Sequence, residues 1–373
     1  MSKTYPAIAV SWHRLPPYAA HLISAGIKAI DVPVHIVASK PPNLVSEVEK
    51  IIDQPIYWIN SDDDCSWSSL GLEVPKIFFQ SGWLSSAFKK LGIEVKQAGG
   101  KIVCFSDNSW KNTPRQWIGL LGFRVKYLKR FDAAWVPGKA GINLMEFYGM
   151  PRDKIYQGMY GSSPEVFKPG ISLEKRPKKF IFVGQLIERK GISTLLNAFE
   201  EFRTSFPEWK LHIIGGGPLE LPTDDPNIQS EGFSTPHRVA EAMRDSRFLI
   251  LPSLEDHWGL VVHEGACSGC GIIVSDSVGA GLDLVTTENG YIFKTNSVES
   301  LTQALVAAAS RNVPQLQLAY ENSLSLANQF GTHTWPEIFK AIIHDLGGNQ
   351  TVDVTATTDA RKPVAFKCQV NEK

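Results

Sequence analysis

Short apolar runs alternate with polar or glycine-containing loops along most of the chain. Runs of about four to eight apolar residues bounded by turn residues predict buried strands. Segments with apolar residues at helical spacing lie between many of these runs. The sequence therefore predicts strands over residues 5–12, 32–38, 56–59, 76–80, 131–136, 180–183, 211–214, 248–251 and 271–274, and helices over 18–28, 239–244, 260–267, 300–309 and 331–345. Because strands that alternate with helices build parallel sheets, we expect an α/β fold.

One predicted strand, loop, helix and strand unit, residues 248–276, carries two carboxylates. Asp256 lies in the loop before the helix, and Glu264 lies about one turn inside it. Both side chains can then face the mouth of one cleft. A carboxylate in such a place can accept hydrogen bonds from ribose hydroxyls, as an acidic residue does in dinucleotide-binding folds.

The start of the same helix predicts an anion site. The backbone amides of Gly259, Leu260 and Val261 would be the unpaired donors of a helix N-terminus. Such donors, together with the helix dipole, favour a phosphate. The alternative is a capped surface helix with two solvated acids, and this stretch taken alone does not decide between the two.

A second phosphate site is predicted after the strand over 180–183. A glycine turn at Gly184 precedes the paired cations Arg189 and Lys190, which lie just before a predicted helix. Glycine lets the backbone approach a ligand, and the cations can meet a diphosphate. The alternative is a pair of ordinary surface cations at the start of a helix.

The length of 373 residues is large for one domain and comfortable for two. A charged run over 174–179 breaks the apolar pattern, so we place the domain boundary near residue 170. We expect an N-terminal domain over 1–170, a C-terminal domain over 171–330, a terminal helix over 331–346 and a tail over 347–373. The tail is polar, and we expect it to be disordered.

The balance of charge excludes one class of partner. The chain has 38 Lys and Arg residues and 38 Asp and Glu residues, so we expect no general attraction to nucleic acid. No apolar stretch is long enough to span a bilayer, and the first apolar run is too short for a signal peptide. We therefore expect a cytoplasmic protein.

The cysteines and one acidic cluster offer further candidate chemistry. Five cysteines form no disulfide framework in a chain of this length. Cys267 and Cys270 make a CxxC pair, for which we favour a structural role over a redox or zinc role because no second ligand pair is evident. The three adjacent acids at 62–64 could hold a metal, but such a run more often forms a solvated turn. We expect no metal site.

Basic and aromatic residues are interleaved over residues 111–131 at near-helical spacing. One interpretation is a helix, over 115–130, that rests on an anionic membrane surface at the inner face of the membrane. The other is an amphipathic helix with a solvated basic face. The second is favoured because Gly119 and Gly122 weaken the helix by about 1 kcal/mol each.

The motif of Asp256, Gly259 and Glu264, followed by the strand entry over 269–273, resembles the donor-binding motif of glycosyltransferase family 4, whose members are of the group 1 type. The resemblance implies a GT-B fold, in which two Rossmann-like domains face each other across a cleft, with the terminal helix crossing back to the first domain. It further implies that a hexosyl group moves from a nucleotide-diphosphate sugar to a saccharide or lipid-linked acceptor during polysaccharide biosynthesis. Similar enzymes retain the anomeric configuration and use neither a metal nor a cofactor.

The resemblance also assigns roles in the C-terminal domain. Lys190 matches a lysine that holds the donor diphosphate, whereas Gln185 stands where the family has an arginine, so Arg189 is expected to supply that charge. Asp256 would contact the sugar hydroxyls and Glu264 the ribose. The expected donor-binding residues are Gly184, Gln185, Arg189, Lys190, Gly232, Phe233, Asp256, Gly259, Leu260, Val261 and Glu264, with Gly232 and Phe233 beside the nucleobase.

In the N-terminal domain, the resemblance points to strand ends that line the acceptor side. Relatives carry a sugar-contacting histidine where this chain has Ser106 and Asp107, and we expect Asp107 to act with Lys190 and Asp256 in catalysis. His13 and Arg14 follow the first strand and are further acceptor-side candidates, although ordinary loop residues are the alternative.

Two other functions are consistent with these departures from the family pattern. The missing histidine and Gln185 favour a catalytically silent homologue that binds a nucleotide sugar or a glycan. A sugar-nucleotide epimerase of similar fold would instead convert the donor without any acceptor. Turnover with and without an acceptor separates the three functions.

Overall fold

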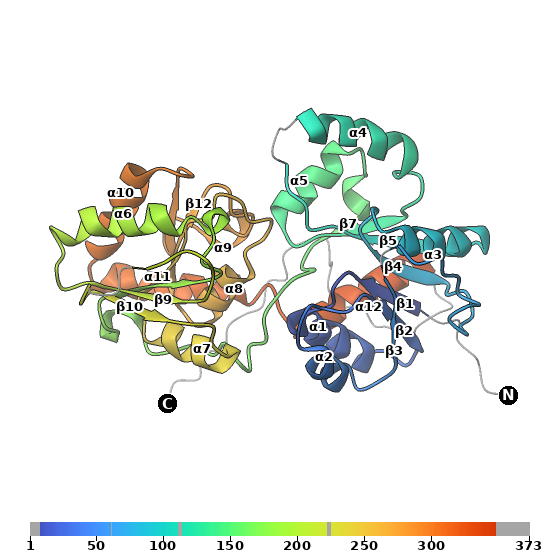
Figure 1. Ribbon diagram of the computed structural model, residues 1–373, viewed down its shortest axis with the longest axis horizontal. Coiled ribbons are helices and arrows are strands. Elements are labelled where there is room, and N and C mark those ends of the chain that lie inside the picture. Colours follow the sequence, from blue (N-terminus) through green and yellow to red (C-terminus); the bar gives the residue numbers. More distant parts are fainter. Residues whose placement is uncertain (1–7, 61, 111–113, 222–224, 348–373) are drawn as a thin grey trace. The chain divides into compact units, whose positions relative to one another are not determined.

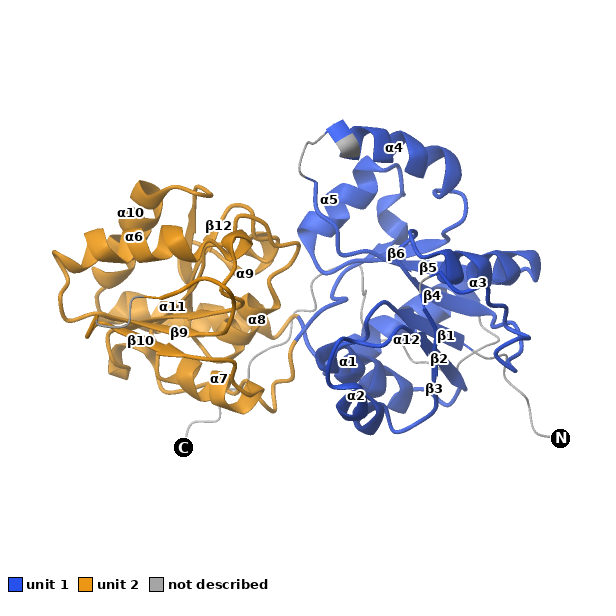
Figure 2. Cartoon of the chain, in the orientation of Figure 1, with its two compact units in different colours: residues 1–161, 330–365 blue, residues 162–329, 366–373 orange. Residues whose placement is uncertain are grey.

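The structure is a computed structural model that describes residues 8–60, 62–110, 114–221 and 225–347. These residues form two compact units (Figure 2). Unit 1 contains the described residues up to 161 and those from 330 onward, and unit 2 contains those from 162 to 329. The chain therefore passes between the units twice.

Unit 1 is built on a parallel sheet with the strand order β3-β2-β1-β4-β5-β6-β7 (Figure 1). Its strands are β1 Ile8–Trp12, β2 Val34–Ala38, β3 Ile56–Trp58, β4 Ile77–Ser81, β5 Lys101–Phe105, β6 Ala133–Trp135 and β7 Ile155–Tyr156. Its helices are α1 Pro17–Lys28, α2 Val45–Ile52, α3 Ser86–Gln97, α4 Pro114–Lys126, α5 Lys139–Phe147 and α12 Trp335–Gly347, with the short 3-10 helix η1 Arg152–Lys154. The strand order reverses at β1, beside β4.

Helices cover both faces of this sheet, which explains the continuous apolar runs in the sequence. Ile8 and Val10 of β1 pack into a core with α1 and α12, whereas Ala9 packs into the opposite core with α3. Alternate residues of a strand point to opposite faces, so a strand that is buried on both sides must be apolar throughout.

Helix α12 closes the first of these cores. The Trp335 ring stacks on Trp135 of β6, with 4.5 Å between ring centroids, and its Nε1 donates to the carbonyl of Met159. At the far end of the helix, the Tyr156 hydroxyl donates to Asp345 at 2.6 Å. The last described helix of the chain is thus an integral part of unit 1.

Unit 2 is built on a second parallel sheet with the order β10-β9-β8-β11-β12-β13. Its strands are β8 Lys179–Val183, β9 Lys210–Ile214, β10 Ile228–Glu231, β11 Phe248–Leu251, β12 Gly271–Ser275 and β13 Gly290–Phe293. Its helices are α6 Ile192–Arg203, α7 Pro236–Arg244, α8 Leu260–Cys267, α9 Gly281–Leu284, α10 Val298–Ala309 and α11 Val313–Ala327, with the 3-10 helices η2 Leu173–Lys175 and η3 Glu188–Lys190.

The division between the units falls at residues 161 and 162, whereas the sequence suggested a boundary near residue 170. The intervening segment packs on unit 2. The amide of Ser162 donates to the His263 ring, and the Gly170 carbonyl accepts from the Tyr320 hydroxyl. The predicted tail lies outside the described residues, apart from Gly347.

A matched pair of helical glycines tests the packing of α12. A Cβ on Gly26 of α1 would lie 2.2 Å from Cζ3 of Trp335, whereas a Cβ on Gly119 of α4 would meet nothing within 4 Å. We expect Gly26→Ala to lower the free energy of unfolding by about 1–3 kcal/mol, because the indole ring must move. Gly119→Ala should raise it by about 0.5–1 kcal/mol through helix propensity. Urea denaturation of both variants measures this, and a stabilising Gly26→Ala would contradict the packing described here.

Candidate active site

Two backbone loops of unit 2 meet at the carboxyl ends of β8 and β9. A Cβ on Gly215 would lie 1.8 Å from the carbonyl oxygen of Gly184, and one on Gly217 would lie 2.3 Å from that of Leu186. Both glycines are therefore required for this close approach. The loop after β8 also presents the exposed Gln185 side chain. In open α/β sheets, ligands bind at the carboxyl ends of strands such as these.

Lys190 and Asp256 form an ion pair at this edge of the sheet. The Lys190 Nζ lies 2.5 Å from Oδ2 of Asp256, and both side chains are mostly buried. The neighbouring Arg189 donates from Nη1 to the carbonyl of Glu255 at 2.7 Å. Both cations predicted to meet a diphosphate therefore contact the loop that carries the predicted sugar-binding acid.

The loop from Asp256 leads into α8 through Gly259, which has a φ of 82°. A Cβ there would lie 2.9 Å from the Leu251 side chain, so the left-handed backbone and the tight packing both require glycine. Leu260 and Val261 form the first turn of α8, where backbone amides have no acceptor within the helix. This geometry provides donors for an anion.

Glu264 lies in the second turn of α8. Burial raises the pKa of its carboxyl group to about 7, and the nearby Ser162 hydroxyl acts in the opposite direction. The group therefore exchanges its proton near neutral pH. Below that range it can donate a hydrogen bond to a ligand, and above it the carboxylate only accepts.

His263 precedes Glu264 and is completely buried. Its Nδ1 accepts from the Ser162 amide at 3.0 Å, and its Nε2 lies 2.9 Å from the carbonyl oxygen of Ala327. Because a carbonyl can only accept, Nε2 carries the proton and the ring is the neutral tautomer. The sequence offered no signal for this role, since it depends on residues more than sixty positions away.

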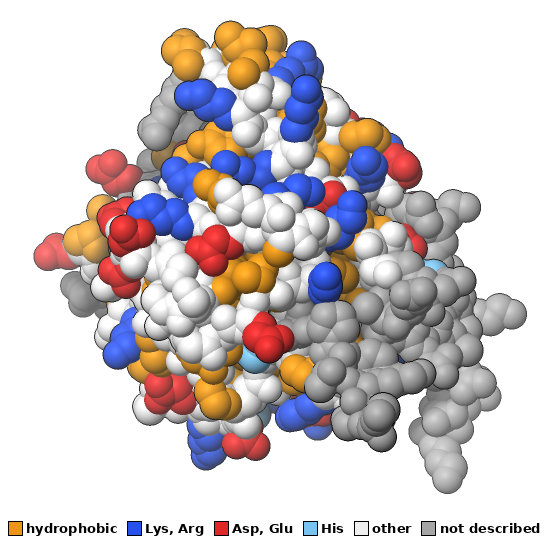
Figure 3. All heavy atoms as spheres, turned by 90° about the vertical axis from the view of Figure 1, so that its right-hand side faces the viewer, with side chains coloured by type: hydrophobic (Ala, Val, Ile, Leu, Met, Phe, Trp, Pro, Cys, Tyr) orange, Lys and Arg blue, Asp and Glu red, His pale blue; other side chains and the backbone are white. Residues whose placement is uncertain are grey.

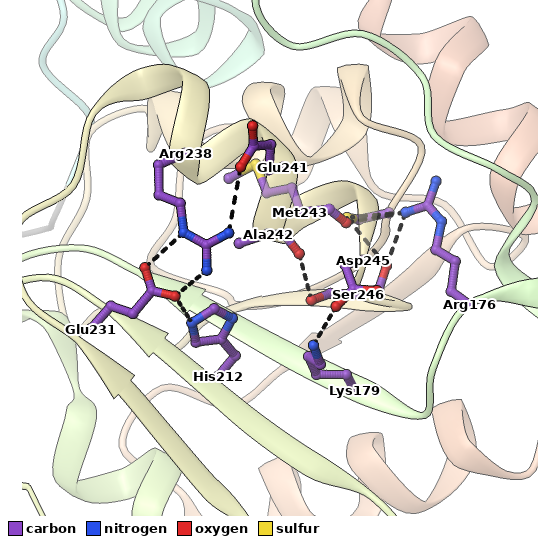
Figure 4. Close-up of polar contacts among 11 residues, drawn as sticks. Arg176, Lys179, His212, Glu231, Arg238, Glu241, Ala242, Met243, Asp245 and Ser246 are labelled. Carbon is purple, nitrogen blue, oxygen red and sulfur yellow. Dashed lines mark hydrogen bonds and ion pairs between the residues drawn. The ribbon is translucent and has the colours of Figure 1, made fainter.

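The end of β10 is held by a polar network (Figure 4). Glu231 forms an ion pair with Arg238 of α7. Its Oε1 also accepts a hydrogen bond from Nε2 of His212 of β9, at 3.0 Å. The next two residues, Gly232 and Phe233, are exposed at the carboxyl end of β10, and 89% of Phe233 is accessible. The network fixes the strand that presents this aromatic side chain.

In unit 1, a cavity of about 490 Å³ lies at the carboxyl ends of β1, β4 and β5. This position matches the reversal of strand order, where ligands of such sheets bind. The cavity is lined by Trp12, His13, Asp62, Ser81, Gly82, Trp83, Leu84, Ser85, Phe105, Ser106, Asp107, Asn108, Met159 and Tyr160. Among these described residues, two are acids and none is Lys or Arg.

Asp107 and Ser106 both lie in this cavity, as neighbours after β5. The Tyr160 hydroxyl donates to Oδ2 of Asp107 at 2.9 Å, which holds the carboxylate in place. Burial, together with Tyr18 and Asp107, raises the pKa of Tyr160, so its hydroxyl keeps its proton. The buried Ser106 Oγ makes no hydrogen bond to any residue that the structure describes.

His13 lines the cavity, and Arg14 follows it with a φ of 49°. The Arg14 amide donates to Oγ of Ser39, which also lies 3.3 Å from Nδ1 of His13. Burial and the neighbouring Arg14 lower the pKa of His13, so the ring is neutral at neutral pH. The sequence does not single out Tyr160, because it lies in the segment that leads out of unit 1, 53 residues from Asp107.

The structure gives the surroundings of the CxxC pair and of the acidic run at 62–64. Cys267 and Cys270 are buried, and burial raises the pKa of both thiols. Asp63 accepts from the Asn60 amide, and Asp64 pairs with Lys90. Within the described ranges, no group of three or more His, Cys, Asp or Glu side chains is placed to hold a metal ion.

Both units are Rossmann-like, with a parallel sheet between helices, and together they define an α/β protein of the GT-B type. Solved structures share this fold. A glycosyltransferase from Rickettsia africae has a TM-score of 0.73 at 15% identity, covering 93% of this chain and 100% of that one. HepE of Anabaena, solved in complex with UDP-glucose, has a TM-score of 0.67 at 13% identity, covering 92% and 100%.

The sequence of unit 2 resembles that of a known family. Residues 165–322 match the family model of the glycosyl transferases group 1. The Bacillus subtilis protein named glycosyltransferase EpsF is 30% identical over 258 residues, covering 62% of this chain and 65% of that protein. WcaL of Escherichia coli, named for colanic acid biosynthesis, is 27% identical over 183 residues, covering 45% of each. The matches span 36–65% of the length of these and the other curated relatives.

The raised pKa of Glu264 predicts a pH-dependent stability. The folded protein keeps this proton up to about pH 7, whereas the unfolded chain loses it near 4.5. The folded state thus binds more protons between these values, so this group makes folding less favourable as the pH rises. We expect Glu264→Gln to become more stable than the parent by about 2 kcal/mol as the pH rises from 5 to 8.

Urea denaturation across this pH range measures the difference. Glu200→Gln removes an exposed carboxylate of α6 and serves as the control, with little expected change. A difference for Glu264→Gln that does not vary with pH would show that its carboxyl group is not shifted.

Proposed function

We propose that this protein transfers a sugar from a nucleotide-diphosphate sugar to a hydroxyl group of a saccharide. The observation that carries the proposal is the 2.5 Å contact between Lys190 and Asp256 beside the start of α8. In a nucleotide sugar, the diphosphate is joined directly to the sugar. A cation for the phosphates beside a carboxylate for the sugar hydroxyls matches that arrangement. The UDP-glucose bound to HepE supports this donor class.

In the proposed reaction, the acceptor oxygen bonds to the anomeric carbon as the bond between that carbon and the diphosphate breaks, and the acceptor proton leaves with the diphosphate. Lys190 and Arg189 stabilise the negative charge that develops on the departing diphosphate, with the amides of Leu260 and Val261 as further donors. Glu264 accepts from the ribose hydroxyls. This step is assigned to side chains and amides and uses no metal ion. The resemblance to glycosyltransferase family 4 supports retention of configuration.

The nucleobase is assigned to the carboxyl end of β10. Phe233 is exposed there and can stack on a base, while the Gly232 backbone leaves room beside it, since a Cβ would meet nothing within 4 Å. Gly184 and Gln185 would lie along the donor at the end of β8. This assignment extends the donor site across the carboxyl edge of one sheet.

The cavity of unit 1 is the proposed acceptor site. Trp12, Trp83 and Tyr160 provide aromatic surface for the apolar face of a sugar ring. Asp107 and the Ser106 hydroxyl offer partners for sugar hydroxyls. Because the described lining has acids but no Lys or Arg, it favours an uncharged saccharide over a phosphorylated one. The names of EpsF and WcaL support polysaccharide assembly as the setting, with the saccharide free or carried on a lipid.

A catalytically silent protein that binds a nucleotide sugar is the second candidate. The exposed Gln185, in place of the arginine of the family pattern, favours it because one cation is lost. The silent protein would bind the donor but would release no nucleoside diphosphate. An epimerase would convert the donor without an acceptor.

Replacing Lys190 tests the donor site. We expect Lys190→Gln to weaken binding of the preferred diphosphate among UDP, GDP, ADP and TDP by roughly 10- to 100-fold, because a charge-assisted contact is lost. Binding of the matching nucleoside should change little, because it carries no phosphate. Calorimetric titration measures the binding of diphosphate and of nucleoside. The control is Lys178→Gln, because Lys178 pairs with Glu208 on the surface. Equal weakening of nucleoside and diphosphate would place the phosphates elsewhere.

Comparing a neutral with a phosphorylated acceptor tests whether the unit 1 cavity binds an uncharged saccharide. We expect kcat/KM for a neutral saccharide acceptor to exceed that for its phosphorylated form by about tenfold or more, because like charges repel. Asp107→Asn should narrow this ratio while leaving the donor Kd unchanged. Steady-state transfer assays with both acceptors measure it. A preference for the phosphorylated acceptor in the parent protein would refute the assignment.

A further inference from the structure

Helix α4 of unit 1 exposes large apolar side chains where a surface helix is normally polar. Trp117 is 51% exposed, and Ile118, Leu121 and Val125 are 67–76% exposed. These positions are spaced so that they share one face of the helix. Leu120 and Phe123, on the other side, are buried in the core. Helix α4 is therefore apolar on its outer face as well as its inner one, and such a face marks an interaction surface.

Aromatic packing holds this face in place. The Trp117 ring lies 5.6 Å from that of Phe147 on α5, and Trp110 contacts both rings. The Arg124 guanidinium donates to the Phe147 carbonyl at 2.7 Å, which ties α4 to the end of α5. The exposed face is thus part of a packed structure.

Cations border the same face. Arg124, Lys126 and Lys129 are exposed, and Arg130 lies over the ring of Tyr127. Residues 114–131 contain no Asp or Glu, and the acid on the adjoining helix is Glu146. No ion pair joins Lys126 or Lys129 to an acid in the part of the chain that the structure describes. Figure 3 shows hydrophobic side chains gathered at the top of the view, with Lys and Arg side chains beside and below them. Arg115, which belongs to the basic residues predicted for this helix, lies outside the side chains that the structure describes.

We propose that the outer face of α4 binds the surface of an anionic lipid bilayer. The apolar side chains would enter the boundary between headgroups and acyl chains, and the bordering cations would meet the lipid phosphates. A second copy of this chain is disfavoured as the occupant, because two such faces would bring like charges together. No described helix is long and apolar enough to cross a membrane.

The sequence favoured a solvated basic face for this helix, and the structure changes that preference. The two glycines weaken the helix, but Ile118, Leu121 and Val125 remain exposed on the face that would have been polar. A solvated face would require polar side chains there.

Sedimentation with lipid vesicles tests the proposal without donor or acceptor. The parent protein should sediment with vesicles of phosphatidylcholine and phosphatidylglycerol, and weakly or not at all with phosphatidylcholine alone. Ile118→Ser with Leu121→Ser should weaken binding at least about tenfold. The matched control, Ile171→Ser with Val313→Ser, removes two exposed apolar side chains of unit 2 and should bind like the parent.

Replacing two lysines distinguishes attraction to the lipid phosphates from nonspecific hydrophobic binding. Lys126→Gln with Lys129→Gln should weaken binding about tenfold or more, and added salt should weaken the parent similarly. Lys168→Gln with Lys210→Gln removes the same charge from unit 2 and should have little effect. Circular dichroism and thermal melting confirm that each variant is folded.

Three results would overturn the proposal. The parent could fail to sediment with the anionic vesicles. The folded α4 variants could sediment as well as their controls. Analytical ultracentrifugation could show a dimer of the parent that Ile118→Ser with Leu121→Ser abolishes, in which case a second copy covers this face.

Discussion

The buried imidazole of His263 fastens both connecting segments of unit 2 to helix α8. Its Nδ1 accepts from the amide of Ser162, the first residue of the unit, and its Nε2 donates to Ala327, close to the last. A buried backbone group that loses such a partner costs about 1–3 kcal/mol. Because Glu264 follows His263 directly, the candidate ribose carboxylate lies on the same turn that holds both chain crossings.

The connecting segments also pack closely within unit 1. A Cβ on Gly161 would lie 2.2 Å from the amide nitrogen of Gly331, so the outgoing and returning segments touch through their backbones. Beyond this contact, Trp335 begins α12 and seals the core against Gly26. The two connecting segments are thus held in unit 2 by the buried ring of His263, which bonds to the backbone of both. In unit 1 they are held by their own backbone contact and by the buried ring of Trp335.

Much of the fold was predictable because parallel strands covered on both faces must be apolar throughout. The runs at β1, β8 and β11 stand out for that reason. The two-residue strand β7 was too short to leave a pattern, and the small residues of α11 gave little contrast between faces. Both elements are stabilised by tertiary packing, which the local sequence pattern does not reveal.

The candidate donor residues could be proposed from their order in a motif, but their geometry could not. Lys190 and Asp256 are 66 residues apart, and only the folded sheet brings them together. Nor could residue type alone show that Tyr160 holds Asp107, or that burial raises the pKa of Glu264. The exposure of the α4 face is likewise a property of packing, since its spacing also suits a helix with a buried apolar side.

The central claim is that the two sites together transfer a sugar. The most direct test is mass spectrometry of the products after the whole chain is incubated with a panel of nucleotide sugars and neutral saccharides. We predict a saccharide that has gained one sugar, together with an equal amount of free nucleoside diphosphate, only when both substrates are present. A donor that is bound but unchanged, or converted to its epimer without any acceptor, would contradict the account.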